Sequence, residues 1–400
     1  MTWTTALLGD VATLDLGKML DQHKNKGELR PYLANINVRR GTFDLNSLRE
    51  MRFESRELDR FSLKRGDIVM CEGGEPGRCA IWKDDAEEMM FQKALHRIRP
   101  GGLLDSSFLF YAFLHFGKSG GFSQYFTGAT IKHLPREQLA KVEVRFPDID
   151  SQRQIAGVLE RYDDLIENNR RRIALLEESA RLLYREWFVQ LRFPGWAEVP
   201  VENGKPVTWK QCTFAEVVDA VGGATPSTTR PDFWDGEVIW LTPTDVTRND
   251  CLYLPTSSRK ISQAGYEACS ATLMPAGTIF MTSRASIGYF ALMDQPACTN
   301  QGFISVVPKI PHSRNFFLFH LMSRVEEFEA KATGATFKEL SKKAFRDLNV
   351  LVPDGDVLAA FETAVQPVVD QVINLKKQTV RLTEARDALL PKLMSGEITV

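Results

Sequence analysis

The sequence predicts an α+β protein made of two similar mixed α/β modules, each followed by one long helix. Three observations favour this architecture: an octapeptide recurs in the second half of the chain, short β-prone runs bounded by turn residues fill both halves, and a heptad pattern closes each half. We place the first module at residues 1–147, its helix at 148–195, the second module at 196–353 and its helix at 354–400.

The repeat is clearest at the end of each module. Residues 127–134 read TGATIKHL and residues 333–340 read TGATFKEL, which agree at six of eight positions at an offset of 333 − 127 = 206. Residues 66–70 (GDIVM) return as residues 277–281 (GTIFM) at an offset of 277 − 66 = 211. Because this period far exceeds the roughly 20–50 residues of a solenoid unit, a whole module is used twice, and pseudo-twofold symmetry is expected.

Within each module, apolar and β-prone residues cluster between glycines and prolines, which is typical of short strands with a few helices. In the first module the strands are expected at 68–70, 78–82 and 142–146, and a helix at about 106–115. In the second module the strands are expected at 238–241, 278–281 and 288–292, and a helix at 315–330.

The helices that close the modules carry the strongest periodic signal. From residue 151 to about residue 191 there is no proline, and apolar residues recur at alternating steps of four and three, as in a coiled-coil seam. A helix of about 40 residues extends about 60 Å, further than one small module covers. The register reappears after a shift of 206 residues, although Pro367 is expected to kink or restart the second helix.

We expect the two helices to pair as an antiparallel coiled coil; the alternative is that each is a core helix of its own module. Asn169 is either a polar residue within the seam that fixes the register of the two helices, or a solvated residue at the edge of the seam. Further apolar residues widen the face, which favours docking of helices from partner proteins. The residues assigned to the seam and to partner docking are Ile155, Leu159, Ile166, Asn169, Ile173, Leu176, Leu183, Trp187, Val365, Val372, Leu375, Leu382 and Leu389.

Composition indicates an ordinary globular protein. Of 400 residues, 44% are hydrophobic and 25% are charged, and no apolar run approaches the roughly 18–20 residues that span a bilayer. The first residues lack a signal-peptide pattern. Six cysteines without CxxC spacing make a disulfide framework or a zinc site improbable. We therefore expect a cytoplasmic protein without metal or cofactor.

The net charge of −1 is a sum over unlike regions. The number of Lys and Arg residues minus the number of Asp and Glu residues is 22 − 19 = +3 for residues 1–147 and 15 − 16 = −1 for residues 196–353. A protein that binds DNA unaided usually has a stronger basic field. Either the basic residues cluster on one face, or a partner supplies much of the phosphate contact.

Several stretches in chain order resemble one known family. Residues 152–156 (QRQIA), 163–169 (DDLIENN) and 186–189 (EWFV) are similar to the central region of type I restriction–modification specificity subunits. The ending at 389–398 (LLPKLMSGEI) resembles the same family. Residues 222–227 (GGATPS), the aromatic runs at 233–234 and 239–241, residues 283–288 (SRASIG) and both TGAT motifs resemble its target-recognition domains.

This resemblance implies a DNA-binding subunit without catalysis of its own. Each recognition domain would read one half of a split, asymmetric sequence in the major groove of double-stranded DNA, and the helices would set the unread spacer. Two adenine methyltransferase (M) subunits would dock on the helices, and ATP-driven restriction and translocase (R) subunits would join that core. The first module departs from the pattern, with DLGKM at 15–19 and EGGEPG at 72–77. A DNA contact expected in one module is therefore not assigned to the equivalent position of the other.

The absence of catalytic motifs agrees with a subunit that is not an enzyme. There is no Pro-Pro pair for the motif with which an amino-methyltransferase holds a flipped adenine. A phosphate-cradling GxxxxGK(S/T) loop and an HExxH metal motif are missing as well.

Candidate DNA contacts follow from residue chemistry, because bases are read by Arg, Lys and hydroxyl side chains while phosphates bind Lys and Arg. For any single arginine the alternative is a solvated face or a local salt bridge. The lysine of each TGAT motif suits a phosphate contact, although a turn packed on the long helix is equally consistent. The candidates are Arg39, Arg40, Arg78, Lys93 and Lys132 in the first module and Arg230, Arg248, Ser283, Arg284 and Lys338 in the second.

A second hypothesis is a non-DNA scaffold, in which two α+β modules on a coiled coil bridge other proteins. The near-neutral second module is its best support. A gel shift with and without the methyltransferase discriminates the two, since a scaffold gives no sequence-specific shift.

Overall fold

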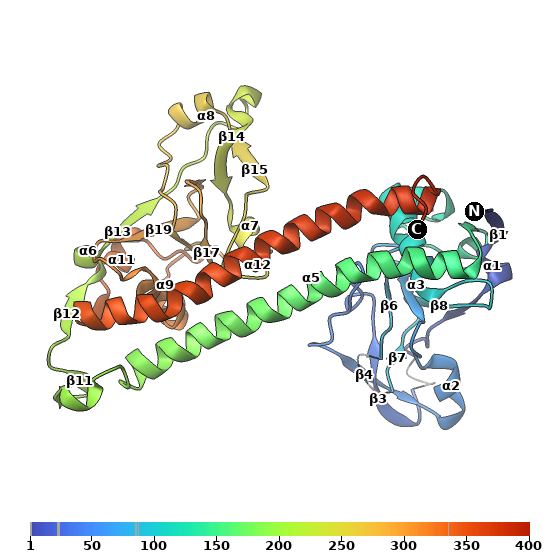
Figure 1. Ribbon diagram of the computed structural model, residues 1–400, viewed down its shortest axis with the longest axis horizontal. Coiled ribbons are helices and arrows are strands. Elements are labelled where there is room, and N and C mark those ends of the chain that lie inside the picture. Colours follow the sequence, from blue (N-terminus) through green and yellow to red (C-terminus); the bar gives the residue numbers. More distant parts are fainter. Residues whose placement is uncertain (1, 22–24, 85, 87, 335) are drawn as a thin grey trace. The chain divides into compact units, whose positions relative to one another are not determined.

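The computed structural model describes residues 2–21, 25–84, 86, 88–334 and 336–400. It forms two compact units: unit 1 comprises Met1–Leu165 with Leu382–Val400, and unit 2 comprises Ile166–Arg381. The helices α5 (Ile149–Tyr184) and α12 (Gly355–Ser395) cross this division, so each contributes residues to both units (Figure 1).

Unit 1 contains three small sheets. Strands β1 and β9 pair antiparallel, a four-stranded antiparallel sheet has the order β2-β8-β5-β6, and a three-stranded sheet has the order β4-β3-β7 with β3 and β7 parallel. The strands are β1 (Thr4–Leu7), β2 (Ala12–Leu16), β3 (Glu28–Leu33), β4 (Arg49–Phe53), β5 (Ile68–Cys71), β6 (Cys79–Ile81), β7 (Met90–Phe91), β8 (Leu95–Pro100) and β9 (Glu143–Phe146). The helix α3 (Ser106–Lys118) begins where the Asp105 carboxylate accepts a hydrogen bond from the Phe108 amide.

Unit 2 repeats this topology. Three of its sheets have the orders β12-β20, β13-β19-β16-β17 and β15-β14-β18, again with one parallel pair in the three-stranded sheet. A further short pair, β10 (Val201–Glu202) with β11 (Lys205–Pro206), has no counterpart among the described sheets of unit 1. The strands are β12 (Lys210–Thr213), β13 (Val218–Gly222), β14 (Trp234–Leu241), β15 (Arg259–Ile261), β16 (Ile279–Thr282), β17 (Phe290–Leu292), β18 (Cys298–Thr299), β19 (Phe303–Pro308) and β20 (Asn349–Val352). The internal repeat seen in a few motifs therefore extends to the order of all three sheets.

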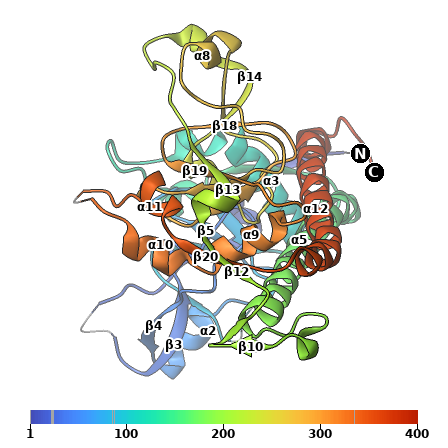
Figure 2. The same cartoon turned by 90° about the vertical axis from the view of Figure 1, so that its left-hand side faces the viewer.

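The three-stranded sheet of unit 2 forms a lobe of its own. With α8 (Gln263–Glu267), strands β14 and β15 stand away from the four-stranded sheet in both views (Figures 1 and 2). Trp234 and Trp240 are 8% and 4% exposed and pack in the core of this lobe, and the Trp240 indole donates to the Ala224 carbonyl at 2.9 Å. Both tryptophans are therefore core residues rather than stacking platforms for bases.

Burial along the long helices follows the predicted seam. Ile155 and Leu159 share the main core of unit 1 with Leu390 and Leu393, both on α12. In unit 2, Ile173 packs in one cluster with Val372 and Leu375. Among the other assigned seam residues, Ile166 and Val365 are buried, and Leu176, Leu183, Trp187, Leu382 and Leu389 are half-buried.

Two alternatives from the sequence are wrong. Asn169 is 5% exposed, so it is not a solvated residue at the edge of the seam. Helix α5 is also not the core helix of one module, because Ile155 and Leu159 belong to the core of unit 1 while Ala180 and Tyr184 belong to that of unit 2.

The second long helix does not restart at its proline. Pro367 lies inside α12, which is continuous from Gly355 to Ser395. A proline costs such a helix about 3 kcal/mol. The adjacent buried residues Val365 and Val369 offset this cost, because burying one valine contributes roughly 1.5–3 kcal/mol.

The helix expected at residues 315–330 is two helices, α9 (Arg314–Met322) and α10 (Val325–Lys331). The break falls at Ser323 and Arg324. The Ser323 hydroxyl donates to the His320 carbonyl at 2.8 Å, and the Arg324 guanidinium donates to the Asn349 carbonyl at 2.6 Å. The break thus coincides with a hydroxyl bond to the preceding turn and a side-chain bond to β20.

His320 on α9 predicts acid sensitivity of unit 2. The ring stacks on Phe316, its Nδ1 lies 2.8 Å from the Tyr184 hydroxyl, and burial lowers its pKa to about 3. Because the folded pKa lies below the unfolded value of about 6.5, the stabilisation is complete above pH 6.5 and is lost as pH falls towards 3. We expect unfolding free energy to fall by at most about 1.4 kcal/mol per pH unit in this window, measured by urea unfolding.

The variant His320→Gln should show a flatter profile between pH 6.5 and 4 than the parent chain. His312→Asn is the matched control, because His312 is exposed and has a left-handed backbone that asparagine tolerates. Equal pH profiles for His320→Gln and the parent chain would contradict the role of His320.

Candidate nucleic-acid interface

Each unit contains one pair of loops joined by backbone hydrogen bonds, which we call the paired loops. In unit 1 they are residues 72–77 and 127–133; in unit 2 they are residues 283–288 and 333–339, of which residue 335 lies outside the described residues. The Leu134 amide donates to the Glu72 carbonyl at 2.8 Å, and the Leu340 amide donates to the Ser283 carbonyl at 2.9 Å. The TGAT motif is thus fastened to a loop whose sequence differs between the modules, EGGEPG in the first and SRASIG in the second.

Each TGAT loop is itself a closed hairpin. Thr127 and His133 exchange two backbone hydrogen bonds of 2.8 and 2.9 Å, and Thr333 and Glu339 exchange two of 3.0 and 2.8 Å. Gly128 has φ +89°, and a Cβ there would lie 2.2 Å from the Ile131 carbonyl oxygen. Only glycine fits this turn, which explains the Thr-Gly pair in the motif.

In unit 1, two candidate arginines converge on one carboxylate. The Arg40 guanidinium lies 2.7 Å from one oxygen of Glu75, and that of Arg78 lies 2.6 Å from the other. Arg78 also donates to the Asn35 carbonyl at 2.7 Å. The hydrogen bond from Arg40, with the charge of Arg78, lowers the pKa of Glu75, so the carboxylate stays ionised between the two cations.

The other candidates of unit 1 are dispersed. Lys132 is exposed on the TGAT loop, within the paired loops. Arg39 forms a separate ion pair with Asp44 at 3.1 Å. Lys93 is exposed just after β7, and its amide donates to the Lys18 carbonyl at 2.9 Å.

In unit 2, three candidates meet in the paired loops. The Ala285 amide donates to the Lys338 carbonyl at 2.9 Å, and the Arg284 guanidinium lies 3.8 Å from the Glu339 carboxylate. Lys338 is exposed. Ser283 is only 2% exposed, and its carbonyl accepts the hydrogen bond that holds the TGAT loop, so the chain without DNA does not present its hydroxyl on the surface.

Arg230 and Arg248 lie outside the paired loops. Arg230 forms a two-bond pair with Asp232 at 2.8 and 2.7 Å and lies over the Phe233 ring. Arg248 is exposed at the end of α7 (Pro243–Thr247). Every candidate arginine except Arg248 therefore has a carboxylate partner among the described residues.

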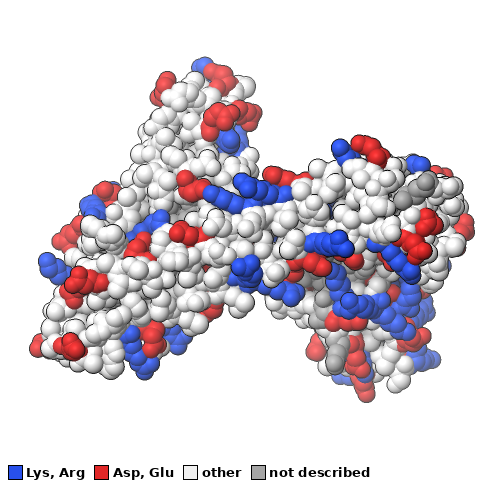
Figure 3. Space-filling view, viewed as in Figure 1, with Lys and Arg blue, Asp and Glu red and all other residues white. Residues whose placement is uncertain are grey.

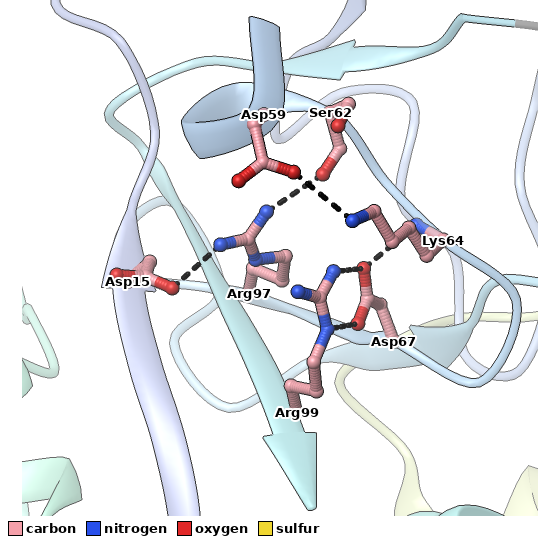
Figure 4. Close-up of polar contacts among 7 residues, drawn as sticks. All are labelled: Asp15, Asp59, Ser62, Lys64, Asp67, Arg97 and Arg99. Atoms are coloured by element: carbon pink, nitrogen blue, oxygen red, sulfur yellow. Dashed lines mark hydrogen bonds and ion pairs between the residues drawn. The ribbon is translucent and has the colours of Figure 1, made fainter. Parts of the chain in front are cut away.

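Sequence reasoning missed a group of ion pairs in unit 1, each with one buried partner, of which two are drawn in Figure 4. Arg97, 6% exposed, lies 2.7 Å from Asp15 and donates to the Ser62 carbonyl, while Arg99 forms two 2.7 Å bonds with Asp67. Lys18 is buried as well and pairs with Glu57 at 2.5 Å. Of these pairs, Arg97–Asp15 joins facing residues of β8 and β2. Asp67 lies just before β5 and Glu57 in a short 3-10 turn, so the pairs depend on strand pairing that the sequence does not signal.

The network neutralises equal numbers of both charges in the first module. Lys18, Arg97 and Arg99 pair with Glu57, Asp15 and Asp67, so the excess of +3 remains with the other residues of the module. On the face in Figure 3, basic and acidic side chains are interspersed over both units. This face therefore does not present an uninterrupted basic field.

Other kinds of site receive no support from the described part of the chain. Among its residues, no group of three or more His, Cys, Asp or Glu is arranged to hold a metal ion. No helix within the described ranges combines the length and apolar character needed to cross a bilayer.

A duplicated module with paired loops and two long helices that contribute to both units is typical of a modular recognition protein. The family model of the type I restriction modification DNA specificity domain matches residues 1–178 and 206–357. The chain belongs to this family and is a DNA-recognition subunit of the type I restriction–modification class, without catalysis of its own.

Individual relatives agree. The MjaIX specificity subunit of Methanocaldococcus jannaschii is 31% identical over 175 residues, which cover 43% of this chain and 40% of that protein. The HindI specificity subunit of Haemophilus influenzae is 21% identical over 407 residues, covering 84% of this chain and 87% of its own. The crystal structure of the S subunit from M. genitalium has a TM-score of 0.61 at 18% identity, covering 98% and 96% of the two chains, which shows the same fold.

The shared carboxylate of Glu75 predicts a change in non-specific binding. In Glu75→Gln, Arg40 and Arg78 lose their common counter-charge and become available to phosphates. Affinity for a duplex without the target should rise about 10-fold, and the slope of log affinity against log salt should steepen by up to about 2. Fluorescence anisotropy over a salt series measures both.

Asp59→Asn is the matched control, because its exposed pair with Lys64 lies outside the paired loops. If Glu75→Gln left the salt slope at the level of this control, the two arginines would not face DNA.

Proposed function

We propose that each module reads one half of a bipartite, asymmetric sequence in double-stranded DNA, while the helices set the spacer between the halves. The observation that carries this proposal is the combination of one topology used twice with loops that differ in side chains: residues 72–77 read EGGEPG and residues 283–288 read SRASIG. Two modules of the same topology that carry different loop side chains suit a DNA target whose two halves differ in sequence.

We assign phosphate and base contacts to Arg39, Arg40, Arg78, Lys93 and Lys132 in the first module and to Arg230, Arg248, Arg284 and Lys338 in the second. The paired loops support the assignment most directly for Arg78, Lys132, Arg284 and Lys338. The remaining residues are supported by charge and exposure alone.

In this proposal the two helices pair antiparallel in a fixed register and so act as a ruler, and three contacts support the pairing. Trp187 packs on Phe361 with ring centroids 5.5 Å apart, Ile173 shares a cluster with Leu375, and Ile155 shares one with Leu393. The two residue numbers of each pair add up to 548, as expected for antiparallel helices in one register. A shift of 206 residues carries position 155 to 361 and position 187 to 393. The Trp187–Phe361 and Ile155–Leu393 contacts are therefore equivalent in the two halves of the repeat. This supports a pseudo-twofold relation between the halves.

Two adenine methyltransferase (M) subunits dock on the helices in this proposal, and restriction and translocase (R) subunits join them. Leu175, Leu182 and Val189 recur every seven residues along α5 and the π-helical turn that follows it, and they are 72%, 53% and 60% exposed. Residues seven apart lie on one face of a helix. An apolar stripe left in water favours coverage by a partner.

Mapping methylated adenines in cells that express this chain with its methyltransferase tests the proposed function and reveals the motif. Exchange of residues 1–147 for the first module of another specificity subunit should then change one half of the motif and leave the other half and the spacer unchanged. A change in both halves would contradict separate reading by the two modules, and a chain that directs no sequence-specific methylation would contradict the proposal as a whole.

Lys338→Ala tests the phosphate contact of the TGAT loop. Because a phosphate contact releases a counterion, we expect similar weakening for all sequences and a salt slope shallower by about 1. Lys331→Ala is the matched control, since Lys331 is an exposed lysine at the end of α10. An unchanged salt slope for Lys338→Ala would remove Lys338 from the set of phosphate contacts.

A further inference from the structure

The TGAT motif holds two apolar side chains in opposite environments. Leu134 and Leu340, the last residues of the motif, are 0% and 1% exposed and anchor it in the main cores of their units. Three residues earlier, Ile131 and Phe337 are 67% and 60% exposed. The same contrast occurs in both modules, at equivalent positions of the repeat.

Each exposed side chain stands at the tip of a constrained hairpin. In unit 1 the hairpin is closed by the two hydrogen bonds between Thr127 and His133. The glycine turn packs against the tip itself, since a Cβ on Gly128 or Gly334 would lie 2.2 or 2.3 Å from the carbonyl oxygen of Ile131 or Phe337. The backbone therefore presents the apolar side chain outward and does not fold it onto the module.

The surroundings of each tip are polar and cationic. Lys132 and Lys338 follow the tips directly and are exposed, as are Thr130 and Thr336 before them. Each tip is thus a single apolar side chain, unlike the stripe along α5, and is too small a surface for a protein partner. An apolar group flanked by a cation matches DNA, in which apolar base faces lie between charged backbones.

We propose that Ile131 and Phe337 are wedges that insert against the base stack of DNA, one beside each half of the target, while Lys132 and Lys338 bind the flanking phosphates. The inference rests on the proposed function, because it requires the modules to face DNA. Apolar side chains of this kind unstack a base step and kink the duplex. The TGAT loops then supply a sequence-tolerant contact, and the diverged loops beside them supply the sequence-specific one.

The test uses the full chain with its methyltransferase and duplexes that carry the mapped motif, with 2-aminopurine at successive positions along and beside each half. Unstacking raises the fluorescence of this base. We expect the parent chain to raise it at one step near each half. Ile131→Ala should abolish the rise at one half only, and Phe337→Ala at the other.

Affinity for the target should fall roughly 10-fold in either alanine variant, with an unchanged salt slope, because no phosphate contact is lost. This separates the tips from Lys338→Ala, which changes the slope. Phe337→Leu should retain the fluorescence change. Leu103→Ala is the matched control, since Leu103 is 64% exposed in unit 1 but outside the paired loops.

Three results would overturn the wedge: no fluorescence change that depends on Ile131 or Phe337, a loss shared equally by Leu103→Ala, or weaker methyltransferase binding with DNA binding intact. In each of these the chain still binds its target, so the proposed function stands. A parent chain that binds no target duplex in the complex would instead contradict the proposed function itself.

Discussion

Each long helix buries one half of its apolar face in the core of unit 1 and the other half in the core of unit 2. Ile155 and Leu159 of α5 pack in the core of unit 1, and Ala180 and Tyr184 pack in the core of unit 2. Each buried large aliphatic side chain contributes roughly 1.5–3 kcal/mol, so both cores require an intact helix. This shared burial explains why α12 continues through Pro367, and it makes the helices the common support of both modules.

The second constraint is electrostatic. A chain of net charge −1 lacks a strong field for DNA, and most of its candidate arginines already face carboxylates, as Arg40 and Arg78 face Glu75. In the proposed DNA contacts, phosphates would replace these carboxylates, which reduces the free energy gained per contact. Such an arrangement limits binding to arbitrary sequences and leaves affinity to the specific contacts and to the partner subunits.

The helix seam and the duplicated module could be predicted from the sequence, because both appear as residue spacings along the chain. The seam follows from spacing alone, and the offset of 206 residues predicted that the modules are alike. The ion pairs of Arg97 and Arg99 could not be predicted, because they depend on the register of β8 against its neighbours. The burial of Ser283 was missed for a similar reason, since a short polar loop gives no signal of which side chain faces inward.

The two modules also differ inside, in a way that bears on how they read DNA. Asp15 faces Arg97 across β2 and β8, whereas the equivalent register pair in unit 2 is Val221 and Ser305. Unit 2 thus has a valine and a buried serine where unit 1 has an ion pair, and the same topology accepts both interiors. The paired loops are likewise held by main-chain hydrogen bonds, from the amides of Leu134 and Leu340, and not by their side chains. The side chains of these loops can therefore differ between the modules without loss of the fold. Recognition of two different half-sites depends on such differences.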